Sequence, residues 1–291
     1  MSENLTNYKI DSKNQLVFLN SGRLFGIQSI NIAQNPGLQN LSYAGMGIDT
    51  VKYIPRQEQT ANVSIDGNLI NQDYFLNLVT GNDLANVYIM RAKNEFDTCY
   101  NLISGYFNNF SCSYGIGSIP QISVQAIFIR DAGKIGTGQL PFNAANQLNA
   151  ISTSNIAPTG EFLIPFGNNI SLGIDTFNTN RLQSFDINIQ SNKVPIYNMG
   201  SKSPKKIDLI YPINVEAIFS FEVGDYDLPR LRNIIQSGII KNINLVAGDY
   251  STNETVCNYN FNNLNLISEN YSSPVDGFVT VNQVYQGKIY N

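Results

Sequence analysis

The sequence has no histidine and no tryptophan among its 291 residues, and it has only three cysteines. Without histidine there can be no Ser-His or Cys-His nucleophile pair and no histidine-ligated metal, and the commonest general base is missing. Cys99, Cys112 and Cys257 form no C-x-x-C pair, so we expect buried thiols in a reducing compartment rather than disulfides or a zinc site. We therefore predict that the protein is not an enzyme and has no catalytic, cofactor-binding or metal-binding residues.

Charge is scarce as well, because 14% of the residues are charged and the net charge is −4. A protein that reads nucleic acid carries a strong basic excess, and intrinsic disorder needs high charge with few aromatic residues. No apolar stretch approaches the roughly 18 residues of a membrane span, and residues 1–14 lack the pattern of a secretion signal. We expect a soluble, folded protein with no membrane partner.

What the chain does have is abundant Tyr, Phe, Ile, Asn and Ser, a composition that favours strands joined by polar turns. Apolar and polar residues alternate in residues 61–66 and 214–223, as in strands with one buried face. Each of these segments is followed by a short helical pattern, at residues 73–80 and 228–237, and each pattern is followed by glycine. The pattern predicts a mainly β protein with two short helices.

Short segments of the first half recur in the second half in the same order. The clearest pair is QSINI at residues 28–32 and QSFDI at residues 183–187. Coincidence in an Asn-rich sequence is the alternative, but the constant order favours a duplication. We predict one domain at residues 1–131, a second at 165–291, and a linker or surface excursion at 132–164. The other matched places are Tyr43 with Tyr197, Pro55 with Pro212, Cys99 with Cys257, residues 107–110 with 261–264, and residues 133–135 with 287–289.

Two pairs of carboxylates could serve a glycoside hydrolase, namely Glu95 with Asp97 and Asp225 with Asp227. We interpret the first as a solvated turn and the second as the start of a helix. Gly115-Ile116-Gly117-Ser118 is too short for a dinucleotide fingerprint and predicts a hairpin turn. Three lysines surround Pro204 in an expected loop; they could contact an acidic neighbour or nucleic acid, or could simply be solvated.

The order of these elements resembles the tail-tube fold of tailed bacteriophages, which baseplate hubs and related contractile injection machines share. A strand at residues 183–189, a long loop containing Met199-Gly200-Ser201-Lys202, an alternating strand, a short helix and further strands carry the resemblance through residue 281. Residues 17–130 look like a more divergent copy. The resemblance implies two tandem tail-tube-like β-sandwich or barrel domains, each with one short helix.

The resemblance implies a structural virion protein whose sheets curve around a channel and whose rings stack into a tube. Its expected partners are itself, other phage tail proteins, and DNA that passes without sequence-specific binding, in a tail assembled in the host cytoplasm. Members of this family use the long loop after the first strand, here residues 37–53 and 193–209, to reach neighbouring subunits. The candidate contact residues are therefore Tyr43, Met46, Lys52, Tyr197, Met199, Lys202, Lys205 and Lys206.

Several alternatives remain open at this stage. Because the fold is carried twice, three chains can build a ring of six similar domains, whereas a ring of six chains would leave one domain of each outside. A trimeric baseplate hub or tail adaptor would have the same fold. A tandem β-sandwich that binds carbohydrate could use exposed tyrosines such as Tyr43 and Tyr271 to stack on sugars.

Overall fold

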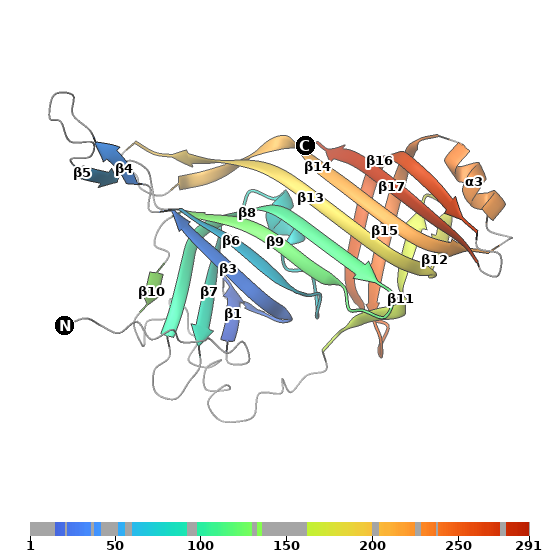
Figure 1. The fold of residues 1–291 in the computed structure, drawn as a ribbon, viewed down its shortest axis with the longest axis horizontal. Helices are drawn as coiled ribbons and strands as arrows, with labels where there is room; N and C mark the ends of the chain where they lie inside the picture. Colours follow the sequence, from blue (N-terminus) through green and yellow to red (C-terminus); the bar gives the residue numbers. More distant parts are fainter. Residues whose placement is uncertain are drawn as a thin grey trace.

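A computed structural model describes most of the chain and confirms that the protein is mainly β. One antiparallel sheet of 15 strands accounts for almost all of the structure, and a separate pair, β4 with β5, forms a small second sheet (Figure 1). The described residues are 15–20, 22–35, 38–41, 52–55, 60–91, 98–129, 133–135, 162–199, 204–224, 228–236, 238–273 and 278–290.

The described elements divide between the two halves of the chain. The first half contains β1 (Gln15–Leu19), β2 (Gly22–Leu24), β3 (Ile27–Asn35), β4 (Leu38–Leu41), β5 (Lys52–Pro55), β6 (Thr60–Asn68), α1 (Leu76–Thr80), β7 (Ala85–Arg91), β8 (Thr98–Gly115), β9 (Gln121–Ile129) and β10 (Gly133–Ile135). The second half contains β11 (Pro165–Ile174), β12 (Phe177–Thr179), β13 (Leu182–Tyr197), β14 (Pro204–Val223), α3 (Leu228–Gln236), β15 (Ile240–Asp249), β16 (Thr255–Ser272) and β17 (Val279–Ile289).

The strands pair in the same order in both halves. In the first half the order is β2-β1-β7-β8-β9-β6-β3. In the second half it is β12-β11-β15-β16-β17-β14-β13. Each strand of the first order takes the place of the strand at the same position in the second. The pairing β13 with β8 then joins the two halves edge to edge.

The same hydrogen bonds recur at matching places. The Asn20 backbone N–H donates to the Asn86 carbonyl, and the Asn86 N–H donates back to Asn20 Oδ1. In the second half Asp175 and Asn242 exchange the same two bonds. The side-chain Oδ1 of Asn86 also accepts from the Ser104 N–H at 2.9 Å, and Asn242 Oδ1 accepts from the Asn263 N–H at 3.2 Å.

Ser104 and Asn263 each sit at a β-bulge with positive φ, 56° and 60°. The bulge is where β8 and β16 leave one pairing partner and bend toward the next. The bulges show which residues of β8 correspond to which residues of β16. The next bulge along each strand falls after Phe107 in β8 and after Leu266 in β16. Phe107 therefore corresponds to Leu266, and the sequence match of residues 107–110 with 261–264 is wrong.

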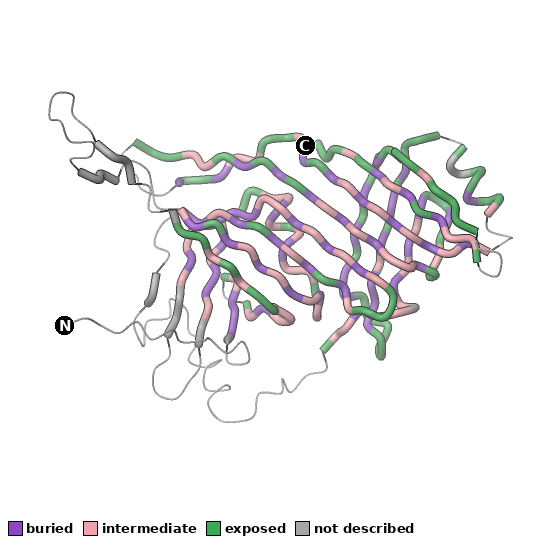
Figure 2. Tube along the Cα trace, in the orientation of Figure 1, coloured by how far each residue is buried: buried purple, intermediate pink, exposed green. Residues whose placement is uncertain are grey.

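Because β8 and β16 bend at these bulges, each half has two layers. One layer runs without interruption through both halves as β3-β6-β9-β8-β13-β14-β17-β16. We call these eight strands the long layer. The other layer consists of β7, β1 and β2 in the first half and of β15, β11 and β12 in the second. Figure 2 shows the resulting alternation of buried and more exposed positions along the strands.

One hydrophobic core lies between the layers and includes buried residues of both halves, such as Val63, Phe110, Phe219 and Tyr259. A hydrogen bond also crosses from half to half, because Tyr259 Oη donates to Asp73 Oδ2 at 2.8 Å. The two halves thus share a sheet and a core, and their division into domains at residues 131 and 165 stays a prediction. Within the described residues, neither helix has the length and apolar character needed to cross a bilayer.

The prediction of long loops at residues 37–53 and 193–209 is wrong for the parts that the structure describes. Residues 193–197 and 204–209, predicted as part of a long loop, are paired strand, since the β13–β14 hairpin continues outward through Tyr197 opposite Pro204. Residues 38–41 and 52–55 pair as well, in β4 and β5. The outer part of the β13–β14 hairpin is held as strand by the apolar side chain of Ile207, which is 2% exposed because it packs against Tyr106 and Ile129 of the first half. Residues 133–135, predicted as linker, form β10 against β8 rather than the counterpart of 287–289 in β17.

Candidate functional site

The outward side of the long layer is covered by polar side chains that line up from strand to strand. Residues directly opposite each other in an antiparallel pair point to the same side of the sheet, so the register defines rows across the layer. The first row is Asn31, Ser64, Gln125, Asn109, Gln190, Asn214 and Lys288. The second is Ser29, Asp66, Ser123, Ser111, Asn188, Glu216, Gln286 and Asn265. A third is Asn68, Gln121, Ser113, Asp186, Ile218, Val284 and Ser268.

We call these three rows the polar face. The second row crosses all eight strands of the long layer without an apolar residue. Its carboxylates are bound by neutral donors: Asp66 accepts from Ser29 Oγ at 2.7 Å and from Ser123 Oγ at 2.6 Å. Glu216 Oε1 accepts from Gln286 Nε2 at 2.9 Å. The row is therefore held by its own hydrogen bonds, and its amides and hydroxyls carry no net charge.

The charges of the polar face are few and mostly negative. Its acids are Asp66, Asp186 and Glu216, and its cation is Lys288. Partial burial raises the pKa of Asp186 above its ordinary value, and the neighbouring Glu216 raises this pKa further. Asn188 Nδ2 donates a hydrogen bond to Asp186 Oδ1 at 3.2 Å, so the donor to this carboxylate is a neutral amide.

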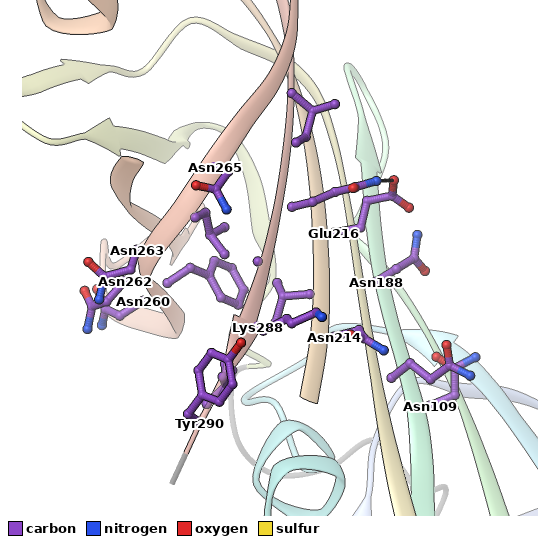
Figure 3. Close-up of a pocket in the computed structure, with 18 residues that line it drawn as sticks. Asn109, Asn188, Asn214, Glu216, Asn260, Asn262, Asn263, Asn265, Lys288 and Tyr290 are labelled. Carbon is purple, nitrogen blue, oxygen red and sulfur yellow. Dashed lines mark hydrogen bonds between the residues drawn. The ribbon is translucent and has the colours of Figure 1, made fainter. Parts of the chain in front are cut away.

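The polar face curves into an open hollow of about 1110 Å³. Figure 3 shows the asparagines that line it on several strands, among them Asn109, Asn188, Asn214 and Asn265, with Lys288 between Asn214 and the asparagines of β16. The hollow has no cluster of convergent titratable groups, and within the described residues no group of three or more His, Cys, Asp or Glu could hold a metal ion. Amide side chains make up most of its polar lining, beside apolar residues such as Ile267 and Ile289.

The long layer ends in two unequal borders. At one end β3 pairs with β6, and no other strand in the described part of the chain pairs with β3. At the other end residues 268–272 of β16 pair with β17. Their counterparts are occupied: β13, which corresponds to β3, pairs with both β14 and β8. Exposure agrees, because Phe185 and Ile187 of β13 are buried whereas Ile30 and Ile32 of β3 are only half-buried.

The predicted contact residues fall at the outer ends of the hairpins, where they are described at all. Tyr197 ends β13, Met199 is fully exposed in the following turn, and Lys205 and Lys206 lie exposed in β14 rather than in a loop. Lys206 pairs with Asp208 at 2.8 Å. Lys52 of β5 lies opposite Leu41 of β4, just as Lys206 of β14 lies opposite Ile196 of β13. Tyr43, Met46 and Lys202 lie outside the described residues.

Other candidates from the sequence lie away from the polar face. Cys112 and Cys257 are buried free thiols, as predicted, and burial raises the pKa of Cys257 to about 12. Tyr271 is 44% exposed on β16. The pairs Glu95 with Asp97 and Asp225 with Asp227, and the side chain of Cys99, lie outside the described residues. The predicted turn at residues 115–118 is confirmed, since the Ser118 N–H donates to the Gly115 carbonyl.

The polar face was missed from the sequence because single strands do not reveal it. The alternating Asn, Ser, Asp and Glu of residues 61–66 and 214–223 gave the outward positions of two strands. Their alignment into rows depends on register across bulges, which composition does not encode.

The fold and this face define an antiparallel β protein with a long polar sheet surface. No protein-family model and no curated protein sequence matched the chain.

Proposed function

We propose that this protein is a structural subunit of a bacteriophage tail tube, in which three chains close into a ring and rings stack around a channel for DNA. The observation that carries the proposal is the polar face: eight strands from two similar halves form one surface, and its second row is polar on every strand. The sheet has a border at each end whose counterpart is paired inside the chain. Head-to-tail repetition of one contact closes into a ring when the rotation permits.

The register supports closure. Following the pairs from Asn31 of β3 leads across four strands to Gln190 of β13, whereas the position equivalent to Asn31 is Asp186. The first half therefore advances the register by four residues (190 − 186) over four strands. One residue of shear per strand corresponds to a strand tilt of about 36°, within the range of closed rings of strands. Three chains of eight strands then enclose a ring about 45 Å across between facing backbones.

The chemistry of the polar face suits a channel for DNA. Duplex DNA is held mainly through Lys and Arg contacts to its phosphates. A wall of amides and hydroxyls with scattered carboxylates offers few such contacts, so a polyanion can pass without being retained. A trimeric hub or tail adaptor of the same fold would share this wall, and it differs in that its rings do not stack.

Electron microscopy of the concentrated, purified protein tests the proposal. We expect ring-shaped end views and striated side views of stacked rings. Single rings that never stack at any concentration or ionic strength would favour the hub or adaptor. A protein that stays monomeric at the highest concentrations would contradict both.

Replacing the neutral wall tests what the polar face does. The change Ser111→Arg with Asn188→Arg adds two cations per chain to the second row, whereas Asn258→Arg with Tyr250→Arg adds them at exposed positions outside the three rows. In filter binding at low salt, we expect assemblies of the first variant to retain duplex DNA, and wild-type protein and the matched control to retain little. Equal retention by both variants would show that the polar face does not line the channel.

A further inference from the structure

The contact between the two halves provides a template for a contact between two chains. Inside the chain, residues 184–190 of β13 pair with residues 109–115 of β8. In this junction Asn188 lies opposite Ser111 and Ile187 lies opposite Cys112. Cys112 and Ile187 are fully buried, so the junction continues both the polar face and the core from one half into the other.

The counterparts of both junction strands are known from the shared bulges. Ser29 corresponds to Ser184, because each follows the bulge near the start of its strand. Asn109 corresponds to Ser268, because each follows the bulge near the middle of its strand. The counterparts of β13 and of the end of β8 are therefore β3 and residues 268–273, the two borders of the long layer.

We propose that β3 of one chain pairs antiparallel with residues 270–272 of β16 in a second copy, in the register of the internal junction. That register places Ala33 opposite Asn270, Ile32 opposite Tyr271, and Asn31 opposite Ser272. The inference rests on the proposed ring and adds to it the strands, the direction and the residue pairs of the contact. An unpaired sheet border is a template for such strand addition.

The opposed side chains agree with this register. Ile32 is half-buried in the single chain and Tyr271 is 44% exposed, so each would cover the other on the core side. Asn31 and Ser272, and Ala33 and Asn270, fall on the side of the polar face and extend it into the next chain. A slip by one residue would instead turn Asn31 and Ala33 toward the core and Ile32 toward the channel.

Besides the β8–β13 junction, the two halves make a second contact inside the chain, and this contact also has a counterpart between two copies. The outer part of the β13–β14 hairpin lies over the first half, where Lys193 Nζ donates to the Leu78 carbonyl in the middle of α1 and the Leu209 N–H donates to Asn82 Oδ1. Its counterpart is the β4–β5 pair, in which Leu38 opposes Pro55 as Lys193 opposes Leu209. The surface that β4 and β5 would cover on the second copy follows α3 and includes Ile239 and Ile240, which are 65% and 58% exposed.

Paired cysteines test the register in the full chain, with Cys99→Ser as background and a short bismaleimide as the probe. Ala33→Cys with Asn270→Cys is the test pair, and we expect ladders of covalent dimers and trimers. Ala33→Cys with Tyr271→Cys is one residue out of register and on the opposite side of the sheet, and we expect at least tenfold less product. Asn188→Cys with Ser111→Cys is the internal control, which links within one chain without raising its mass.

The apolar surface is tested separately by Ile239→Asp with Ile240→Asp, followed by sedimentation. We expect at least a tenfold weaker association, and no change for Ile116→Asp, at a position 62% exposed in the turn after β8. Microscopy of the same samples separates the two claims. Rings without the selective cross-link would overturn the register and leave the proposed function standing, whereas absence of rings and of cross-linked oligomers would overturn both.

Discussion

At the scale of single residues, the two halves solve one packing problem in opposite ways. A Cβ on Gly105 would lie 2.2 Å from the Phe128 ring, and a Cβ on Gly287 would lie 2.3 Å from the Leu264 side chain. By the correspondence that the bulges give between β8 and β16, Gly105 corresponds to Leu264 and Phe128 to Gly287. The large and small partners have exchanged strands while the filled volume is kept, as dense packing requires.

Replacing this glycine therefore overpacks the site. We expect Gly105→Ala to lower the free energy of unfolding by about 1–3 kcal/mol, measured by urea denaturation. Gly105→Leu should cost more, and Gly105→Leu with Phe128→Gly should recover much of the loss because it reproduces the arrangement of the second half. Gly22→Ala is the control, since the nearest atom to its Cβ is 3.7 Å away. If the double variant is less stable than Gly105→Leu alone, the equivalence of these positions is wrong.

Lys193 is 8% exposed, and burial lowers its pKa from the ordinary value of 10.5 to about 8. Between these two values the unfolded chain binds more protons at this lysine than the folded chain does, so the free energy of unfolding rises with pH in this window. From pH 7.5 to pH 9 we expect Lys193 to contribute a rise of at most about 1 kcal/mol, because partial solvent contact reduces the effect. Urea denaturation of Lys193→Met should lack this rise, and an unchanged pH dependence would contradict the assignment.

At the scale of elements, the repeated Asn at the bulges explains why β8 and β16 bend where they do. Asn86→Ala and Asn242→Ala each leave a backbone N–H without its side-chain acceptor, at Ser104 and Asn263 respectively. We expect each variant to lose about 1–2 kcal/mol of stability in denaturant titration. Asn86→Asp and Asn242→Asp keep the acceptor and serve as controls. A large loss in one half with none in the other would contradict the equivalence of the two bulges.

The hydrogen bond from Tyr259 to Asp73 joins β16 to the turn before α1. Asp73 also accepts from the Phe75 and Leu76 N–H groups, and burial raises the pKa of its carboxyl. We expect Tyr259→Phe to cost about 1–2 kcal/mol, because it removes a donor from a buried carboxylate. Hydrogen exchange should then show faster opening of α1 than in wild type. Exposed Tyr250→Phe is the control, and equal effects of the two would show that the bond does not couple the halves.

The sequence allowed some elements to be predicted because their signals are local. The two-residue period of residues 214–223 gave β14, and the helical apolar stripe of residues 228–237 gave α3. The hairpins β1–β2 and β11–β12 were not predicted, since short apolar runs such as Leu16, Val17 and Phe18 have no clear period. The outer β13–β14 hairpin was read as a loop because Gly, Ser, Pro and Lys dominate its tip, while buried Ile207 depends on a partner in the other half.

At the scale of the whole molecule, the proposed ring has two junctions per chain: the β8–β13 junction is made inside the chain, and the two borders remain for the other. The polar face continues to both borders, and the register advances by four residues from the first half to the second across the internal junction. A closed ring is the arrangement in which every such border is paired. The polar face would then be the wall of the channel.

A reconstruction of the assembled protein by electron cryo-microscopy measures this directly. We predict a ring of three chains with near sixfold symmetry, in which β8–β13 junctions alternate with β16–β3 junctions and the row from Ser29 to Asn265 faces the channel. A ring whose polar face points outward, or whose chains meet through other strands, would contradict the account.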